Sequence, residues 1–158
     1  MSESRYSKQA AAQIMTVLNE LGYRYSFQDE AGIFRIDFRL QEIRDVILFI
    51  GVEQQMYTVT VVSPLRVPKE KIPQAAEYLC RINQKQRFGS FIMDYDTGEG
   101  RSHCEVMCRG LLPWTDVVEQ SIKLPVELFH FYGGGLLSVS YGDVSPKETA
   151  QKMLKNPV

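Results

Sequence analysis

The first part of the chain changes from a helical to a strand pattern of apolar residues. Over residues 7–21 the apolar positions are spaced i, i+3, i+4 and i+7, and they are Ile14, Val17, Leu18 and Leu21. This spacing predicts an amphipathic helix, for which Gly22 is a suitable C-cap. Two β-prone runs follow, residues 23–27 and 33–40. The acidic segment QDEAG between them is typical of a hairpin loop.

Two further runs extend this hairpin into an antiparallel unit. Residues 44–52 and 56–62 are largely apolar and β-branched, and Ser63-Pro64 is expected to end the second run. The connections between these four strands are too short for a parallel crossover, so the strands are expected to pair antiparallel. Within residues 33–40 apolar and charged residues alternate, which predicts one buried and one solvated face.

A helix and a second hairpin occupy the middle of the chain. Pro68 and Pro73 confine the start of the helix, which is expected to run to about Gln86. Its apolar stripe consists of Ile72, Ala75, Ala76, Leu79 and Ile82. Residues 87–109 then read as one β-hairpin, because the turn DYDTGEG offers Asp and Gly where a positive φ is needed.

The last third of the chain predicts a long helix and a short tail. The helix begins near Pro113-Trp114-Thr115, and Pro125 is expected to kink or interrupt it. An apolar segment, residues 126–137, follows and contains Gly133, Gly134 and Gly135. These glycines indicate either a helix break or close helix packing, and we favour close packing. In the tail, Ser145-Pro146-Lys147-Glu148 is a strong helix start.

Together these elements predict an α+β fold with the order α-β-β-β-β-α-β-β-α. An antiparallel sheet of five to six strands is expected to pack against the helices. Residues 1–144 are interpreted as one domain and residues 145–158 as a short helical tail that docks on it.

Composition and charge narrow the functional classes. The 158 residues are 44% apolar and 23% charged, which is typical of one globular domain. With 18 basic and 19 acidic residues the net charge is −1 and the basic residues are scattered, so no nucleic-acid partner is expected. The apolar runs are too short for a membrane span, and the polar start lacks the apolar region of a signal peptide. We therefore expect a cytoplasmic protein with no membrane partner.

Candidate chemical groups favour structural explanations. Asp94 and Asp96 resemble part of a calcium loop, but the remaining ligand positions do not fit, and a hairpin turn is the better interpretation. His103 is expected on the strand face opposite Cys104 and Cys108, which argues against a zinc site. No catalytic motif accompanies the cysteines. We expect no enzyme activity, no catalytic residue, no metal and no cofactor.

The apolar segment 126–137 is the candidate interaction surface. Its aromatic residues, together with Trp114, are more often core residues than a ligand site. The segment is nevertheless apolar on all sides, so part of it is expected to form an interface. The candidate partner-binding residues are Phe129, Phe131, Tyr132, Leu136 and Leu137.

Four segments carry a resemblance to a known family. They are YRYSFQDEAGIFRIDFR, VPKEKIPQAAEYLCRINQ, FGSFIMDYDTGEGRSHCEV and LPWTDVVEQSI. In pattern and turn residues the chain resembles the YbjN family of bacterial proteins, whose domain looks like the type III secretion chaperone fold. The resemblance covers most of residues 21–139. Pro125, the three glycines and the fourth early strand depart from the family pattern.

The resemblance implies a fold and a general role. Family members are described as sensory or regulatory proteins, and secretion chaperones of similar fold are homodimers that hold an extended client segment. The leading hypothesis is a non-enzymatic, chaperone-like or adaptor domain that binds a protein or peptide, as a homodimer, with strand addition at a sheet edge as one route. The alternative is a small-molecule sensor with a pocket between sheet and helices, in which Arg35, Arg39 and Arg66 hold an anionic ligand.

Overall fold

One antiparallel sheet of six strands organises the chain, with the strand order β1-β2-β3-β4-β6-β5. The computed structural model describes residues 4–40 and 45–155. Its elements are α1 (Lys8–Glu20), β1 (Ser26–Gln28), β2 (Ile33–Phe38), β3 (Val46–Val52), β4 (Met56–Arg66), the short 3-10 helix η1 (Lys69–Lys71), α2 (Ile72–Asn83), β5 (Ser90–Met93), β6 (Glu99–Met107), α3 (Thr115–Tyr141) and α4 (Pro146–Leu154). The predicted α+β class and element order are confirmed. The third strand was predicted from Arg44, which lies outside the described residues.

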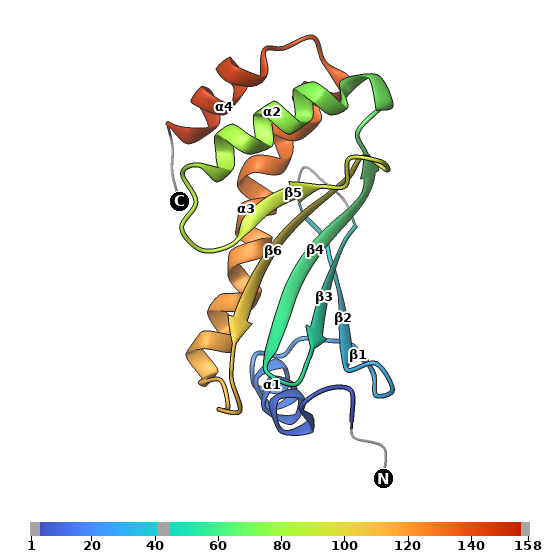
Figure 1. Cartoon of the computed structure of the whole chain (residues 1–158), viewed down its shortest axis with the longest axis vertical. Coiled ribbons are helices and arrows are strands. Elements are labelled where there is room, and N and C mark those ends of the chain that lie inside the picture. The colour runs from blue at the N-terminus through green and yellow to red at the C-terminus, as the bar shows by residue number, and fades with distance from the viewer. Residues whose placement is uncertain (1–3, 41–44, 156–158) are drawn as a thin grey trace.

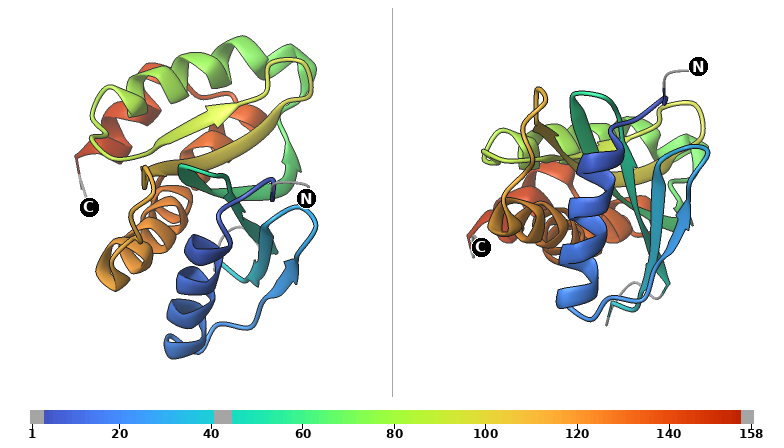
Figure 2. Two further views of the ribbon diagram at one scale, coloured as in Figure 1. Left: turned by 60° about the horizontal axis from the view of Figure 1, so that its bottom comes forward. Right: turned by 90° about the horizontal axis from the view of Figure 1, so that it is seen from below.

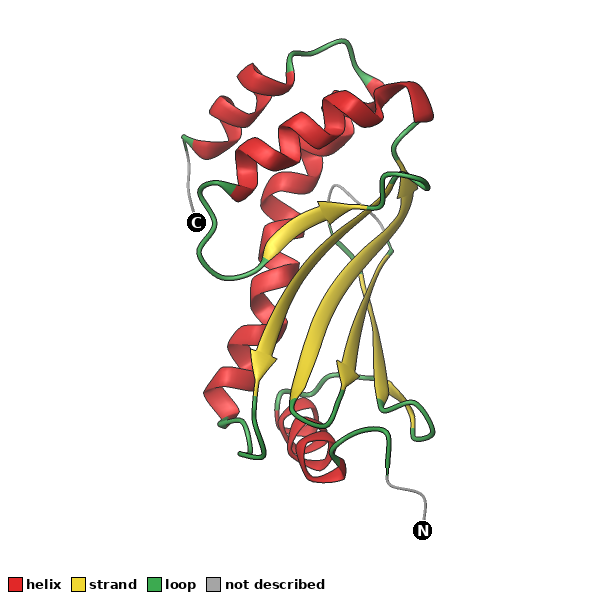
Figure 3. Cartoon of the chain, in the orientation of Figure 1, coloured by secondary structure: helices red, strands yellow, loops and turns green. Residues whose placement is uncertain are grey.

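The helices cover one face of the sheet. The long helix α3 runs along the sheet, α2 and α4 lie across one end, and α1 lies near the other end (Figures 1 and 3). Helices α1 and α3 lie side by side against this face (Figure 2). Alternate strand residues point into the layer between sheet and helices and are fully buried, among them Phe34, Leu48, Ile50, Val59 and Val61.

The helix α3 runs through Pro125 without the predicted interruption. A proline in a helix leaves the carbonyl four residues earlier without its usual donor. Here that carbonyl belongs to Ser121, and it accepts a hydrogen bond from Cys104 Sγ on β6 at 3.1 Å. Ser102, also on β6 and fully buried, donates to the carbonyl of Pro125. The strand therefore supplies donors at the place where the helix loses one.

A buried tyrosine extends this contact between α3 and the sheet. Tyr57 Oη on β4 lies 2.9 Å from Ser121 Oγ, and Ser121 in turn donates to the carbonyl of Val118. Burial raises the pKa of Tyr57 above its ordinary value, so the phenol stays protonated as a donor. Side chains from β4 and β6 thus fix the position of α3 along the sheet.

Close packing explains part of the glycine run in α3. All three glycines lie within the helix, so they do not break it. A Cβ built on Gly135 would lie 2.2 Å from Tyr78 Oη, which is closer than any real contact. Tyr78, fully buried on α2, donates to the carbonyl of Tyr132 at 2.7 Å. Gly135 therefore provides the space in which α2 and α3 meet.

Strand β4 is longer than the sequence suggested. It was expected to end at Ser63-Pro64 but continues to Arg66, and its pairing with β6 shifts register between Val62 and Arg66. Such a bulge accommodates a proline that cannot donate to the ladder. Ser63 Oγ accepts a hydrogen bond from the Leu65 N–H across the bulge.

The two edges of the sheet differ. At β5, the side chain of Asn83 accepts from the Phe91 N–H at 2.9 Å and donates to the Phe91 carbonyl at 2.8 Å. A carboxamide therefore occupies the backbone groups that an added strand would need. At the other edge, β1 has only three residues. An added strand is therefore blocked at Phe91 on the β5 edge. On the β1 edge it would find only a three-residue strand to pair with.

The tail helix α4 docks on the rest of the chain, as predicted. Ser145 Oγ accepts from the Glu148 N–H as the N-cap, and Pro146 occupies the first turn. The helix packs against α2 and α3, and Ala150 is buried in that contact.

Replacing Gly135 with alanine tests the close approach of α2 and α3. We expect Gly135→Ala to lower the free energy of unfolding by about 2 kcal/mol, because overpacking outweighs the better helix propensity of alanine. Urea denaturation measures the change. Gly51→Ala is the control, since a Cβ there meets open space. The double variant with Tyr78→Phe should recover part of the loss, and a Gly135→Ala protein as stable as the wild type would contradict the packing argument.

Removing the Asn83 side chain tests the closed edge. We expect Asn83→Ala to cost about 1–3 kcal/mol, because it leaves two backbone groups of Phe91 without partners. The exposed edge should also promote self-association, measured by light scattering at increasing protein concentration. Asn83→Asp keeps the acceptor and loses the donor, so an intermediate effect is expected. Equal stability of all three proteins would refute the role given to Asn83.

Candidate binding surfaces

The face of the sheet opposite the helices carries a shallow hollow. Along one row of paired residues Arg35, Phe49, Thr60 and His103 lie side by side on β2, β3, β4 and β6. The hollow has a volume of about 720 Å³. Its apolar floor consists of Ile47, Phe49 and Val62, which are half-buried. Among the described residues no helix packs on this face.

Charged side chains of both signs surround the apolar floor. Arg35 pairs with Asp37 at 3.2 Å on the β2 side. On the opposite side the Glu99 carboxylate forms ion pairs with Arg66, at 3.1 Å, and with Arg101. The exposed Arg35–Asp37 pair contributes little to stability, so its two side chains remain available to other partners. The Glu99 side chain is only 17% exposed.

The hollow brings together the three arginines that sequence analysis proposed for an anionic ligand. Arg35, Arg39 and Arg66 all line it. It lies on the open face, whereas the pocket was expected between sheet and helices. The charges of Arg35 and Arg66 are already compensated by carboxylates, and Arg39 lies 3.9 Å from Asp45.

Sequence analysis missed the apolar floor of the hollow. Phe49 and Ile47 belong to the run VILFIGV, in which both strand faces are apolar. A strand buried on one face only should alternate with polar residues. The lack of alternation in β3 was the available signal that its second face has an apolar role.

The predicted partner-binding residues of α3 divide into buried and accessible ones. Phe129, Tyr132 and Leu136 are buried in this chain's own core. Phe129 stacks on Phe91 of β5 with ring centroids 5.1 Å apart. Phe131 is 40% exposed and Leu137 is half-buried. A partner-binding role for this set stays a prediction, and only Phe131 and Leu137 are accessible in the single chain.

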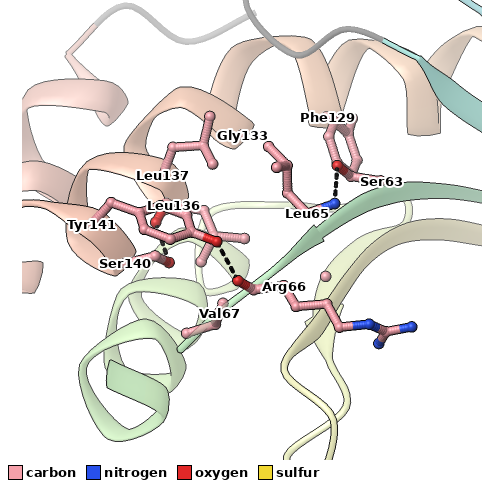
Figure 4. Close-up of a pocket in the computed structure, with 11 residues that line it drawn as sticks. Ser63, Leu65, Arg66, Val67, Phe129, Gly133, Leu136, Leu137, Ser140 and Tyr141 are labelled. Carbon is pink, nitrogen blue, oxygen red and sulfur yellow. Dashed lines mark hydrogen bonds between the residues drawn. The ribbon is translucent and has the colours of Figure 1, made fainter. Parts of the chain in front are cut away.

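A small cavity separates α3 from the bulge of β4 (Figure 4). Leu136 and Leu137 line it from α3, and Leu65 lines it from the bulge. Tyr141 Oη closes one end by donating to the carbonyl of Arg66. The cavity volume is about 20 Å³, which is room for roughly one water molecule. A metabolite does not fit there.

The turn between β6 and α3 departs most from expectation. Trp114 was expected in the core with the aromatic residues of α3, but it is 79% exposed. Leu111, which the sequence pattern did not single out, is 76% exposed. The exposure of Leu111 and Trp114 depends on the path of the turn, which the local sequence pattern does not predict.

Cys104 is buried and Cys108 is half-buried, whereas Cys80 is exposed on α2. Burial raises the pKa of the Cys104 thiol to about 12, so the nucleophilic thiolate is not formed near neutral pH. Burial also raises the pKa of Cys108. Within residues 4–40 and 45–155, no three His, Cys, Asp or Glu side chains are grouped as a metal site would require.

The Asp94 carboxylate is used by its own hairpin turn. It accepts hydrogen bonds from the backbone N–H groups of Asp96 and Thr97. The bond from Thr97 is the main reason that the pKa of Asp94 lies below its ordinary value. Gly98 completes the turn with φ +72°, and a Cβ there would meet the Val67 carbonyl oxygen at 2.3 Å. These contacts account for Asp94 and Gly98 in the turn.

Comparisons with known proteins agree with this architecture. A solved structure described as "Crystal structure of YbjN, a putative transcription regulator from E. coli" matches with a TM-score of 0.59 at 12% sequence identity. The match covers 78% of this chain and 91% of that chain, and it shows a shared fold. No curated protein matches the chain. In the part of the chain that the structure describes, no helix has the length and apolar character of a membrane span.

The family comparison covers more than half of the chain. Residues 10–112 match the family model YbjN, which is described as "Putative bacterial sensory transduction regulator". The match extends from α1 to the turn before α3 and includes the whole sheet. The chain belongs to the YbjN family.

Proposed function

We propose that the chain is a non-enzymatic regulatory domain that binds an extended protein or peptide segment on the open face of its sheet. The observation that carries the proposal is the apolar floor of Ile47, Phe49 and Val62 beside charged side chains of both signs. The regulatory part of the proposal follows the family description.

The composition of the hollow favours a peptide over a simple anion. An anion would gain from unpaired arginines, but Arg35 and Arg66 already face carboxylates. A peptide with apolar side chains covers the floor, and its charges can exchange partners with Arg35–Asp37 and Arg66–Glu99. Binding sites commonly combine an apolar centre with a polar rim in this way.

The resemblance to secretion chaperones supports the same mode of binding. Those proteins hold client segments against their surface as homodimers, and we include a homodimer in the proposal. Strand addition is the less favourable route here, because Asn83 occupies the backbone groups of Phe91 at the β5 edge. Docking across the face needs no free edge.

Selection from a displayed peptide library tests the proposal. We expect enriched peptides to carry bulky apolar residues and to bind the wild-type protein in the micromolar range, measured by fluorescence anisotropy. Phe49→Lys should weaken binding by about tenfold or more, because it places a charge on the apolar floor. Phe49 is half-buried on the open face, so its replacement should leave the fold intact.

Phe88→Lys is the matched control for this experiment. Phe88 is 74% exposed and does not line the hollow. The Phe88→Lys protein should bind the selected peptides as tightly as the wild type does. Peptides that bind Phe49→Lys and wild type equally, or a selection that enriches none, would count against the open face as the binding site.

A small-molecule sensor is the second candidate, supported by the meeting of Arg35, Arg39 and Arg66 at one hollow. It predicts that an anionic metabolite raises the melting temperature in a concentration-dependent way. Arg35→Gln with Arg66→Gln should abolish that shift, and Lys85→Gln, outside the hollow, should retain it. A panel of nucleotides and carboxylates that leaves the melting temperature unchanged would remove this candidate.

A further inference from the structure

The β6 side of the open-face hollow holds two arginines on one carboxylate. Arg66 and Glu99 are partners in the β4–β6 ladder, and Arg101 lies two residues further along β6, on the same sheet face. Arg66 Nη2 donates to one oxygen of Glu99 at 3.1 Å, and Arg101 Nε donates to the other oxygen. Because the Glu99 side chain is largely buried, its carboxylate holds both guanidinium groups in place. Two positive charges thus meet one negative charge.

Both arginines keep donors for a further acceptor. A guanidinium group has five N–H donors, and the side chains of Arg66 and Arg101 are 53% and 40% exposed. The Arg66 side chain points away from α3 (Figure 4). Among the described residues, Glu99 is the only carboxylate within 4 Å of either guanidinium group. The pKa of Asp94 is lowered mainly by its bond from the Thr97 N–H, and Arg101 is a minor cause.

The β2 side of the same hollow is balanced in charge. Arg35 pairs with Asp37 at 3.2 Å, and Arg39 lies 3.9 Å from Asp45. Within the described part of the chain, each arginine on that side therefore has a carboxylate of its own. An anionic group that enters the hollow gains more on the β6 side, where two cations share one anion.

The two arginines lie beside the apolar floor. Arg101 is the ladder partner of the floor residue Val62 on one side and of Ile92 on β5 on the other. Neighbouring strands are about 4.8 Å apart, which is one or two residues of an extended chain. A segment that places an apolar side chain on the floor therefore brings a nearby side chain to the arginines. It can then continue over Ile92, which is 41% exposed. An acidic residue within the segment fits this position better than its C-terminal carboxylate.

We infer that Arg66 and Arg101 make the open face selective for segments in which Asp or Glu lies within about three residues of a bulky apolar side chain. The inference rests on the proposed peptide binding and adds the chemistry of the bound segment. A free carboxylate would gain only an exposed ion pair, which contributes little. The same pair adds specificity when an apolar side chain already holds the segment on the floor.

A series of synthetic peptides measures this selectivity. One peptide that the wild-type protein enriches from the displayed library is made with acetylated and amidated ends, and with Glu, Gln or Lys beside its apolar anchor. We expect the Glu peptide to bind about fivefold more tightly than the Gln peptide, and the Lys peptide to bind most weakly, measured by fluorescence anisotropy. The advantage of Glu should shrink as the salt concentration rises.

The outcomes of this series separate the inference from the proposed function. Equal binding of the Glu and Gln peptides would overturn the inference and leave peptide binding on the open face intact. Tighter binding of the Lys peptide would overturn it as well. A library that enriches no peptide would overturn both.

Two matched double variants locate the selectivity. Arg66→Gln with Arg101→Gln should bind the Glu and Gln peptides equally, because both guanidinium groups are lost. Arg35→Gln with Arg39→Gln removes the same charge from the β2 side and should keep the fivefold ratio, whatever its effect on overall affinity. A ratio lost in the second variant and kept in the first would place the acidic residue on the β2 side and overturn the inference.

A single variant covers the case in which the Arg66→Gln, Arg101→Gln protein does not fold, as judged by thermal denaturation. Arg101→Gln alone keeps the Arg66–Glu99 pair. It should lower the advantage of the Glu peptide to about twofold, because one of the two guanidinium groups remains. An unchanged advantage in this variant would also overturn the inference.

Discussion

The position of α3 on the sheet depends on hydrogen bonds that β6 supplies around Pro125. Without the proline the carbonyl of Ser121 would have a donor within the helix, and Cys104 would have no such acceptor to meet. With the proline present, only one placement of α3 along β6 lets Ser102 donate to the carbonyl of Pro125 while Cys104 donates to the carbonyl of Ser121. A buried polar group without a partner costs about 1–3 kcal/mol. The polar contacts therefore select the register between helix and strand.

Other features follow from this placement. With α3 fixed, Gly135 comes opposite Tyr78, and α2 can approach closely enough for the phenol to reach the carbonyl of Tyr132. Phe129 then stacks on Phe91, so that α3 covers β5 as well as β6. Among the described residues the helices pack on one side of the sheet, which leaves the other side accessible.

Local pattern was sufficient to predict the elements but insufficient to predict their contacts. Periodicity and turn residues predicted the α+β order, because a hairpin such as that of Asp94 and Gly98 is encoded within a few residues. Pro125 was expected to kink or interrupt the helix, and the interruption does not occur. The donor that the Ser121 carbonyl loses is replaced from a distant strand, which the local pattern does not reveal. The burial of Leu136 and the exposure of Trp114 depend on the path of the chain around α3. Likewise, only the register of β2, β3 and β4 brings Arg35 and Arg66 to one hollow.

The unequal edges of the sheet limit how copies of the chain can assemble. Copies of a protein can pair strand to strand without limit only when each copy has two free sheet edges, because each copy must then pair with a neighbour on both sides. Asn83 occupies the backbone of Phe91, so the sheet has a terminated end at β5. Any pairing through β1 joins two copies edge to edge and leaves a terminated end on each side. Association of this chain through its strands would therefore stop at two copies.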